Sequence, residues 1–166
     1  NISGNNIYDC ADYGVYDTGS NNQIIENNDF SNNGDYEVYI QGSDWVVENN
    51  ELYDSSYGVY LDSSSSVMIK DNKIYNYTTY GTYAESSTDI NFTGNYIDGI
   101  SGTGYDCIRF YLSDNNYFTN NYVTDCGWSG LKIYESDNNY IRNFTAENLG
   151  KSYARCLQFG HGATSH

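Results

Sequence analysis

The sequence predicts an all-β solenoid of about seven coils. Three observations lead to this fold class. The segment from Gly58 to Ile74 recurs along the chain with a period of roughly 21 to 26 residues. Its apolar residues alternate with polar ones over runs too short for a helix. These runs are rich in β-branched and aromatic residues and are bounded by Asn, Asp, Ser and Gly, which favours strands separated by turns.

Each repeat contains an alternating run that begins at an apolar anchor, Val59 in the segment just named. Successive side chains of a strand point to opposite faces, so the anchor and the second residue after it are expected in the core. The anchors are Val15, Val38, Val59, Thr82, Ile108, Leu131 and Leu157, and the residues two further on are Asp17, Ile40, Leu61, Ala84, Phe110, Ile133 and Phe159.

An asparagine follows most anchors at a nearly constant distance and is itself flanked by apolar residues. The aligned asparagines are Asn5, Asn28, Asn50, Asn72, Asn95 and Asn121, and Phe144 interrupts the series. Apolar residues lie three positions before them (Ile2, Ile25, Val47, Ile69, Phe92, Phe118, Ile141) and two after (Ile7, Phe30, Leu52, Ile74, Ile97, Val123, Ala146). We expect each asparagine at a bend between two strands, where its amide bonds to the coils above and below.

The repeat resembles that of right-handed parallel β-helix proteins. The residues Gly58-Val59-Tyr60-Leu61 followed by Asn72-Lys73-Ile74 are close to the repeat of pectate lyases, polygalacturonases, phage tailspikes and archaeal or bacterial cell-surface proteins. The resemblance covers nearly the whole chain and implies a right-handed single-stranded parallel β-helix. It implies no single function, since the same coil serves as an enzyme, an adhesin or a structural rod.

Length and charge indicate how many domains the chain forms and which kinds of partner it can bind. We expect residues 1–166 to form one domain that is a fragment or processed part of a longer chain, without a membrane span. The 22 acidic and 7 basic residues argue against nucleic acid as a partner. Residues 1–69 contain no Lys or Arg, so one end of the rod is strongly anionic. Solubility or salt tolerance is the preferred explanation of this asymmetry, and Ca²⁺ binding or head-to-tail contact is the alternative.

The 20 tyrosines include an outward-facing series on the anchor strands. Tyr16, Tyr39, Tyr60 and Tyr83 lie between the two core positions of four successive coils. They are expected to form an exposed column, which either stabilises the sheet by cross-strand contact or stacks against sugars. Glycosylation sequons begin at Asn1, Asn76, Asn91 and Asn143 and agree with an extracellular or cell-surface location, although chance explains several in so Asn-rich a chain.

The four cysteines favour one disulfide. Cys107 and Cys156 precede anchors two coils apart, about 10 Å and beyond the reach of a disulfide. Cys126 lies in the loop edge between them and could pair with either; Cys107–Cys126 is preferred, with Cys126–Cys156 second. Cys10 would be a free thiol or would bridge to a partner.

The return segments after the asparagines are longest at Asp98–Asp106 and Glu147–Arg155, and such insertions often mark a binding edge. The predicted site combines stacking surfaces with cations and would suit an acidic polysaccharide. The alternative is that the cations merely neutralise neighbouring carboxylates. The candidate ligand-binding residues are Tyr105, Arg109, Trp128, Lys132, Tyr153 and Arg155.

Catalytic residues are not assigned, and the enzyme hypotheses rest on two resemblances. Gly160-His161-Gly162 resembles the Gly-His-Gly motif of polygalacturonases, but the paired carboxylates that an inverting hydrolase needs are not found in register with it. A pectate-lyase-like site would need Ca²⁺ on clustered aspartates beside an arginine, for which Asp106, Asp125 and Arg109 are the candidates. No cofactor is otherwise required.

The sequence therefore predicts an extracellular, non-catalytic structural β-helix of a cell-surface or filamentous assembly that self-associates end to end and contacts glycans. The alternative is a polysaccharide lyase, a glycoside hydrolase or a carbohydrate-binding module.

Overall fold

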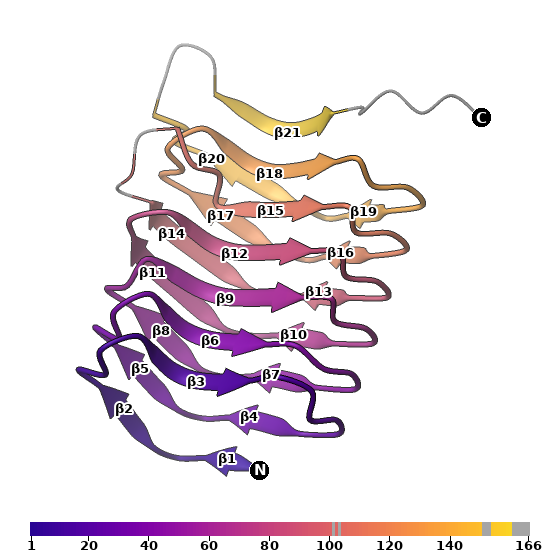
Figure 1. Ribbon diagram of the computed structural model, residues 1–166. Coiled ribbons are helices and arrows are strands. Elements are labelled where there is room, and N and C mark those ends of the chain that lie inside the picture. The colour runs from indigo at the N-terminus through magenta and orange to yellow at the C-terminus, as the bar shows by residue number, and fades with distance from the viewer. Residues whose placement is uncertain (101, 103, 151–153, 161–166) are drawn as a thin grey trace.

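The computed structural model describes residues 1–100, 102, 104–150 and 154–160, and over these residues the chain is an all-β solenoid without helices. Three strands of each coil turn about a common axis, and equivalent strands of successive coils stack into three parallel sheets of seven strands each (Figure 1). Because each coil lies on the previous one, order in the sequence becomes position along the rod. Within the described residues, no helix has the length and hydropathy needed to cross a membrane.

The three sheets contain the three kinds of strand that the repeat predicts. The first sheet contains β1 (Ile2–Ser3), β4 (Ile24–Glu26), β7 (Val46–Glu48), β10 (Met68–Lys70), β13 (Asn91–Thr93), β16 (Tyr117–Thr119) and β19 (Tyr140–Arg142). The second contains β2 (Asn6–Tyr8), β5 (Asp29–Ser31), β8 (Glu51–Tyr53), β11 (Lys73–Tyr77), β14 (Tyr96–Ile100), β17 (Tyr122–Thr124) and β20 (Thr145–Glu147). The third contains β3 (Tyr13–Asp17), β6 (Tyr36–Ile40), β9 (Tyr57–Asp62), β12 (Tyr80–Glu85), β15 (Ile108–Tyr111), β18 (Ser129–Tyr134) and β21 (Arg155–Gly160).

The pairing register confirms the predicted columns. In the third sheet the anchors pair in succession from Val15↔Val38 to Leu131↔Leu157. The apolar residues before and after the asparagines pair in the same way in the first and second sheets. Their side chains fill the interior as a continuous stack of apolar layers along the axis, except in β21, where Leu157 and Phe159, both expected in the core, are 39% and 66% exposed.

The asparagine ladder is present at the bend between the first two sheets. The side-chain Oδ1 of Asn72 accepts the backbone N–H and the amide of Asn50, both at 3.0 Å, and its Nδ2 donates to Oδ1 of Asn95 at 3.1 Å and to the Val47 carbonyl at 2.8 Å. The same amide contacts run from Asn5 to Asn121. Each ladder amide thus satisfies backbone groups that the bend leaves unpaired.

The residue before each ladder asparagine makes the bend possible. It has a left-handed backbone, with φ near 55° at Asn27, Asn49, Asp71 and Asn120 and 68° at Gly4 and Gly94. Asn, Asp and Gly adopt this conformation at the lowest cost, which explains their recurrence at this position.

A serine ladder lines the turn from the third sheet to the next coil. It was not among the features predicted from the sequence. Backbone N–H groups of Ser64, Ser87 and Ser113 donate to the hydroxyls of Ser87, Ser113 and Ser136 at 3.1, 3.0 and 2.8 Å. The repetition of serine at this position was visible in the sequence, but serine is common in turns and is a weaker signal than an aligned amide.

A completely buried carboxyl group lies within the apolar interior. Glu37 of β6 is fully buried in a column that has Gly14, Gly58 and Gly81 in neighbouring coils. Its carboxylate accepts hydrogen bonds from the Asn33 amide and from the Ser55 hydroxyl. Burial raises the pKa of Glu37 to about 7, against the lowering effect of these hydrogen bonds.

Candidate functional site

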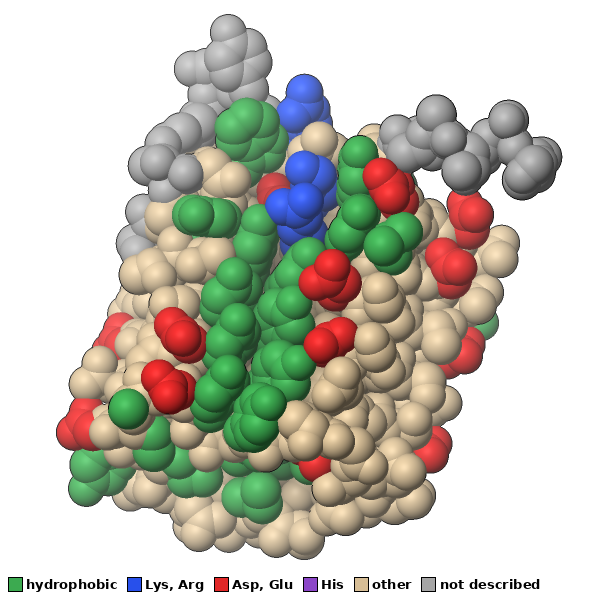
Figure 2. All heavy atoms as spheres, viewed as in Figure 1, with side chains coloured by type: hydrophobic (Ala, Val, Ile, Leu, Met, Phe, Trp, Pro, Cys, Tyr) green, Lys and Arg blue, Asp and Glu red, His purple; other side chains and the backbone are tan. Residues whose placement is uncertain are grey.

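Two tyrosine columns run side by side on the outer face of the third sheet. Tyr16, Tyr39, Tyr60 and Tyr83 form one column, and Tyr13, Tyr36, Tyr57 and Tyr80 form the other. Figure 2 shows them as two adjoining columns of hydrophobic side chains, with acidic side chains on both sides and basic side chains at the upper end. We call these eight residues the tyrosine ladder. The second column was missed, although Tyr-x-x-Tyr recurs in four successive coils.

Ring packing corrects the prediction of an exposed tyrosine column. Tyr16 is 57% exposed, but Tyr39, Tyr60 and Tyr83 are half-buried because the second column packs against them. Along the lower coils the rings stack on one another, with centroids 5.3 Å apart for Tyr39 and Tyr60 and 4.7 Å for Tyr36 and Tyr57. These ring faces are therefore occupied by other rings, which favours the structural role over stacking against sugars.

Carboxylates border the ladder on both margins. The hydroxyl of Tyr39 donates to Asp62 at 2.8 Å, and that of Tyr60 donates to Glu85 at 3.0 Å. Burial, together with these carboxylates, raises the pKa of both phenols. On the other margin, the exposed residues Asp12 and Asp35 directly precede the first two tyrosines of the second column. We call Asp12, Asp35, Asp62 and Glu85 the acidic rails.

The ladder ends at two cations in the same outward column as Tyr83. Arg109 pairs with Tyr83 on one side and Lys132 on the other. Its guanidinium donates to the Tyr80 hydroxyl at 2.7 Å and lies 5.7 and 5.9 Å from the ring centroids of Tyr80 and Tyr83. Lys132 Nζ lies 5.8 Å from the centroid of the Tyr134 ring. We call Arg109 and Lys132 the cationic pair.

The cationic pair lacks an ion-pair partner within the described part of the chain, where salt bridges form only at Lys70 and Lys73. The carboxylate of Asp106 interacts with both charges; it is buried and accepts the backbone N–H of Ser129 at 3.1 Å. Burial raises the pKa of Asp106, whereas the charges of Lys132 and Arg109 lower it. Within the described residues the cations form no ion pair with a surface carboxylate, although their charges partly compensate the buried carboxyl of Asp106.

Two exposed aromatic side chains lie on the segments that lead into the two cationic strands, Tyr105 before β15 and Trp128 before β18. Tyr105 is 38% exposed, and its ring meets the Tyr80 ring edge-on at 5.3 Å. Trp128 is 40% exposed and lies against Gly104 of the preceding coil. Arg155 begins β21, and its backbone N–H donates to the Trp128 carbonyl at 3.2 Å. These three residues and the cationic pair form what we call the aromatic–basic site; Tyr153, also predicted here, lies outside the described residues.

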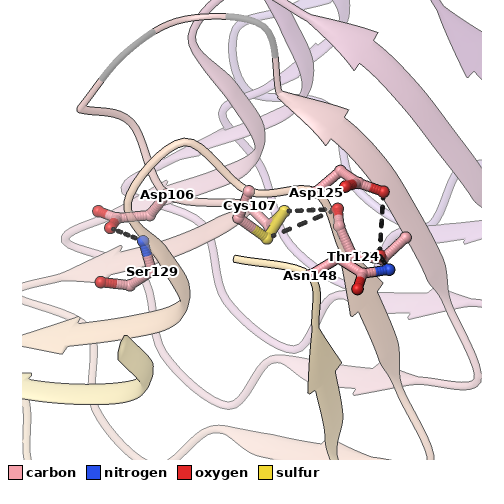
Figure 3. The surroundings of a disulfide bond; sticks show 7 residues. Asp106, Cys107, Thr124, Asp125, Ser129 and Asn148 are labelled. Carbon is pink, nitrogen blue, oxygen red and sulfur yellow. Dashed lines mark hydrogen bonds between the residues drawn. A yellow bond between two sulfur atoms is a disulfide. The ribbon is translucent and has the colours of Figure 1, made fainter. Parts of the chain in front are cut away.

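A disulfide underlies the site. Cys107 and Cys126 are bonded, with their Cα atoms 5.3 Å apart, in the pairing that the spacing favoured (Figure 3). Each lies two residues before a side chain of the aromatic–basic site, Arg109 or Trp128. The crosslink therefore ties the two loop segments that present the site. Cys10 and Cys156 are free and exposed.

The two candidate calcium-binding aspartates are not brought together. Asp106 and Asp125 lie on opposite sides of the disulfide, and Asp125 accepts the Thr124 hydroxyl at 3.1 Å (Figure 3). Over the described ranges, no three His, Cys, Asp or Glu side chains are grouped so that they could hold a metal ion. His161 lies outside the described residues.

The sequon asparagines differ in accessibility. Asn1, Asn76 and Asn143 are exposed, whereas Asn91 is half-buried within β13, between two neighbouring strands. Glycosylation at all four remains a prediction.

The stacked coils define the chain as a parallel β-helix protein with an aromatic and basic patch at one end of its third sheet. The family model described as "Right handed beta helix region" matches residues 1–146, and the chain belongs to that family. The coil is therefore right-handed, as the resemblance implied. No curated protein matches the sequence.

Two solved structures share the fold. The enzymatically active domain of tailspike protein 2 from bacteriophage CBA120 aligns with a TM-score of 0.61 and 13% identity, over 95% of this chain and 25% of that one. The Streptococcus pneumoniae surface protein and adhesin PfbA aligns with a TM-score of 0.50 and 14% identity, over 84% of this chain and 49% of that one. The chain thus spans about a quarter and about half of these proteins.

Proposed function

We propose that this chain is an extracellular β-helix rod that contacts a glycan at the aromatic–basic site without cleaving it. The observation that carries the proposal is the exposure of Tyr105 and Trp128 beside two cations that have no ion-pair partner among the described residues. Aromatic rings offer apolar faces to the C–H surfaces of sugars, and Arg and Lys bind hydroxyl and carboxylate oxygens. A rigid sheet and a disulfide hold both kinds of group in place, which lowers the entropic cost of binding.

An extracellular location is supported by the disulfide, since such bonds persist in oxidising compartments. An architectural role is supported by the distribution of charge along the rod. Residues 1–69 carry 12 acidic and no basic side chains, and all 7 basic residues follow. Because coil order is axial order, the anionic coils of one copy would meet the more balanced coils of another in a head-to-tail contact.

Glycan binding is tested by titrating the protein against a panel of oligosaccharides and measuring heat or tryptophan fluorescence. We expect Trp128→Ala and Tyr105→Ala to weaken binding at least about tenfold, the loss of a stacked aromatic contact. The matched control is Tyr117→Ala, which removes a 53% exposed tyrosine from the first sheet. Equal loss in the control, or no binding by the wild type, would contradict the proposal.

The non-catalytic role and the assembly are tested separately. Release of reducing or unsaturated ends from any bound oligosaccharide would show that the site belongs to an enzyme. Light scattering over a range of protein and salt concentrations tests head-to-tail association. We expect larger particles at low salt, because screening weakens contacts between exposed charges.

A further inference from the structure

The cationic pair places two like charges side by side, and within the described residues neither forms an ion pair. Arg109 and Lys132 are directly paired on adjacent parallel strands, and like charges in cross-strand positions destabilise a sheet. The chain has 22 acidic residues and could have placed a carboxylate beside them at the surface. Moreover, Arg109 Nε is buried without a hydrogen-bond partner in the described residues.

The tyrosine ladder below the pair has the opposite electrostatic character. The acidic rails contribute carboxylates on both margins, and the ladder coils up to residue 69 contain no Lys or Arg. Carboxylates accept hydrogen bonds from sugar hydroxyls and repel anionic groups. One continuous face therefore attracts an anion at one point and repels anions along the adjoining coils.

We propose that the ligand is a saccharide with a single anionic group, a carboxylate or sulfate, bound at the cationic pair. Its uncharged sugar units extend over the tyrosine ladder, where their hydroxyls donate to the acidic rails. This inference rests on the proposed glycan-binding function and specifies its ligand. It also differs from the acidic polysaccharide expected from the sequence.

Rung spacing explains why a polyanion is disfavoured. Successive coils lie about 4.8 Å apart, which is comparable to the length of one unit in an extended sugar chain. When one acidic unit occupies the cationic pair, the following units lie beside the coils that contain Glu85 and then Asp62. A carboxylate on every unit would therefore meet a carboxylate of the protein on each of these rungs.

The test compares ligands that share a backbone and differ only in charge. The probes are a neutral cello-oligosaccharide, its aldonic acid with one terminal carboxylate, and the equal-length oligomer oxidised to glucuronate on every unit. The same three forms of a malto-oligosaccharide provide a second backbone geometry. Affinities are measured by calorimetry with the full chain. We expect the singly charged form to bind about tenfold tighter than the neutral form and tighter than the fully charged form.

Substitutions test which residues cause the preference for one charge and which cause the rejection of a charge on every unit. Lys132→Gln and Arg109→Gln should each weaken binding of the singly charged probe more than binding of the neutral probe, so that the tenfold advantage of the single charge is lost. Because Arg109 also bonds to Tyr80, thermal unfolding checks its variant, and Lys132→Gln provides the independent test. The double variant Asp62→Asn/Glu85→Gln should strengthen binding of the fully charged probe by about fivefold and weaken binding of the neutral one.

The outcomes separate this inference from the proposed function. If the fully charged or the neutral probe binds wild type most tightly, the glycan site stands and the single-anion assignment is wrong. The assignment also fails if the double variant leaves the order of affinities unchanged. If no probe binds, the proposed function fails together with the inference.

Discussion

Replacing the buried Glu37 by Gln should change how the stability of the rod depends on pH. The folded-state pKa of Glu37 is about 7, whereas its ordinary value is 4.5. Below both values the group is protonated in the folded and unfolded chain, so its stabilising effect is fully present. As pH rises from the unfolded to the folded pKa, only the unfolded chain releases the proton, and the free energy of unfolding falls. The two pKa values correspond to a loss of about 3 kcal/mol.

Glutamine is a suitable replacement because it retains the shape without the charge. Its carbonyl oxygen can accept the Asn33 amide hydrogen, and its own amide can donate to the Ser55 hydroxyl. Among the other groups around Glu37, Asp54 raises its pKa by repulsion, and Tyr77 is a neutral neighbour at these pH values. The variant should therefore lack this titration while the other groups titrate as before.

Urea unfolding of the wild type and Glu37→Gln at about pH 4 and about pH 8 measures the effect. We expect the two proteins to differ little in acid and the variant to be more stable by about 2 to 3 kcal/mol at the higher pH. A difference in stability that does not change with pH would refute the reasoning, because it would mean that Glu37 has the same pKa in the folded and the unfolded chain. Equal slopes with denaturant confirm that both proteins unfold from the same fold.

Three further predictions concern the stability of the coil. Glu51 has a lowered pKa because its carboxylate accepts hydrogen bonds from Lys73 and a tyrosine, so Glu51→Gln should cost less than about 1 kcal/mol at neutral pH, and the difference should vanish in acid. Asn72→Ala should reduce the free energy of unfolding by about 3 kcal/mol, since it leaves buried backbone groups unpaired, whereas Asn5→Ala at the exposed end should cost clearly less. Cys107→Ser should cost about 3 kcal/mol, because the disulfide closes a segment with a sequence separation of 19. Urea unfolding measures all three, and equal losses for the two asparagine variants, or a loss at Glu51 that persists in acid, would contradict the argument.

The fold was predictable because its signals repeat. An apolar residue at the position of Val59 could be accidental in one coil, but six apolar residues and one threonine in seven aligned copies are a constraint that stacked strands satisfy. The asparagine ladder was predictable for the same reason, because the amide is needed at the same bend in successive coils. Rung spacing excluded a disulfide between Cys107 and Cys156 and left Cys126 able to pair with either, and the structure contains the preferred pair.

The sequence allowed several residues of the candidate site to be named, but not the contacts that they make with one another. Tyr105, Arg109 and Trp128 could be selected as aromatic and basic residues near the longer return segments. The sequence alone does not show that Arg109 bonds to Tyr80. The two residues lie 29 positions apart, and the second tyrosine column, to which Tyr80 belongs, was not among the predictions. The outer tyrosines were predicted to form an exposed column because periodicity specifies which face a side chain is on, and not whether a neighbouring side chain covers it.

By itself, the sequence determined that this protein is a β-helix, because the period, the alternation and the aligned amides are local patterns that every coil repeats. The tertiary structure alone decided which tyrosine rings stack on one another, that Glu37 lies in the interior, and that Arg109 and Lys132 stand together without an ion-pair partner in the described chain. These features depend on contacts between side chains from different coils, whose rotamers and solvent exposure are settled only when the coils pack.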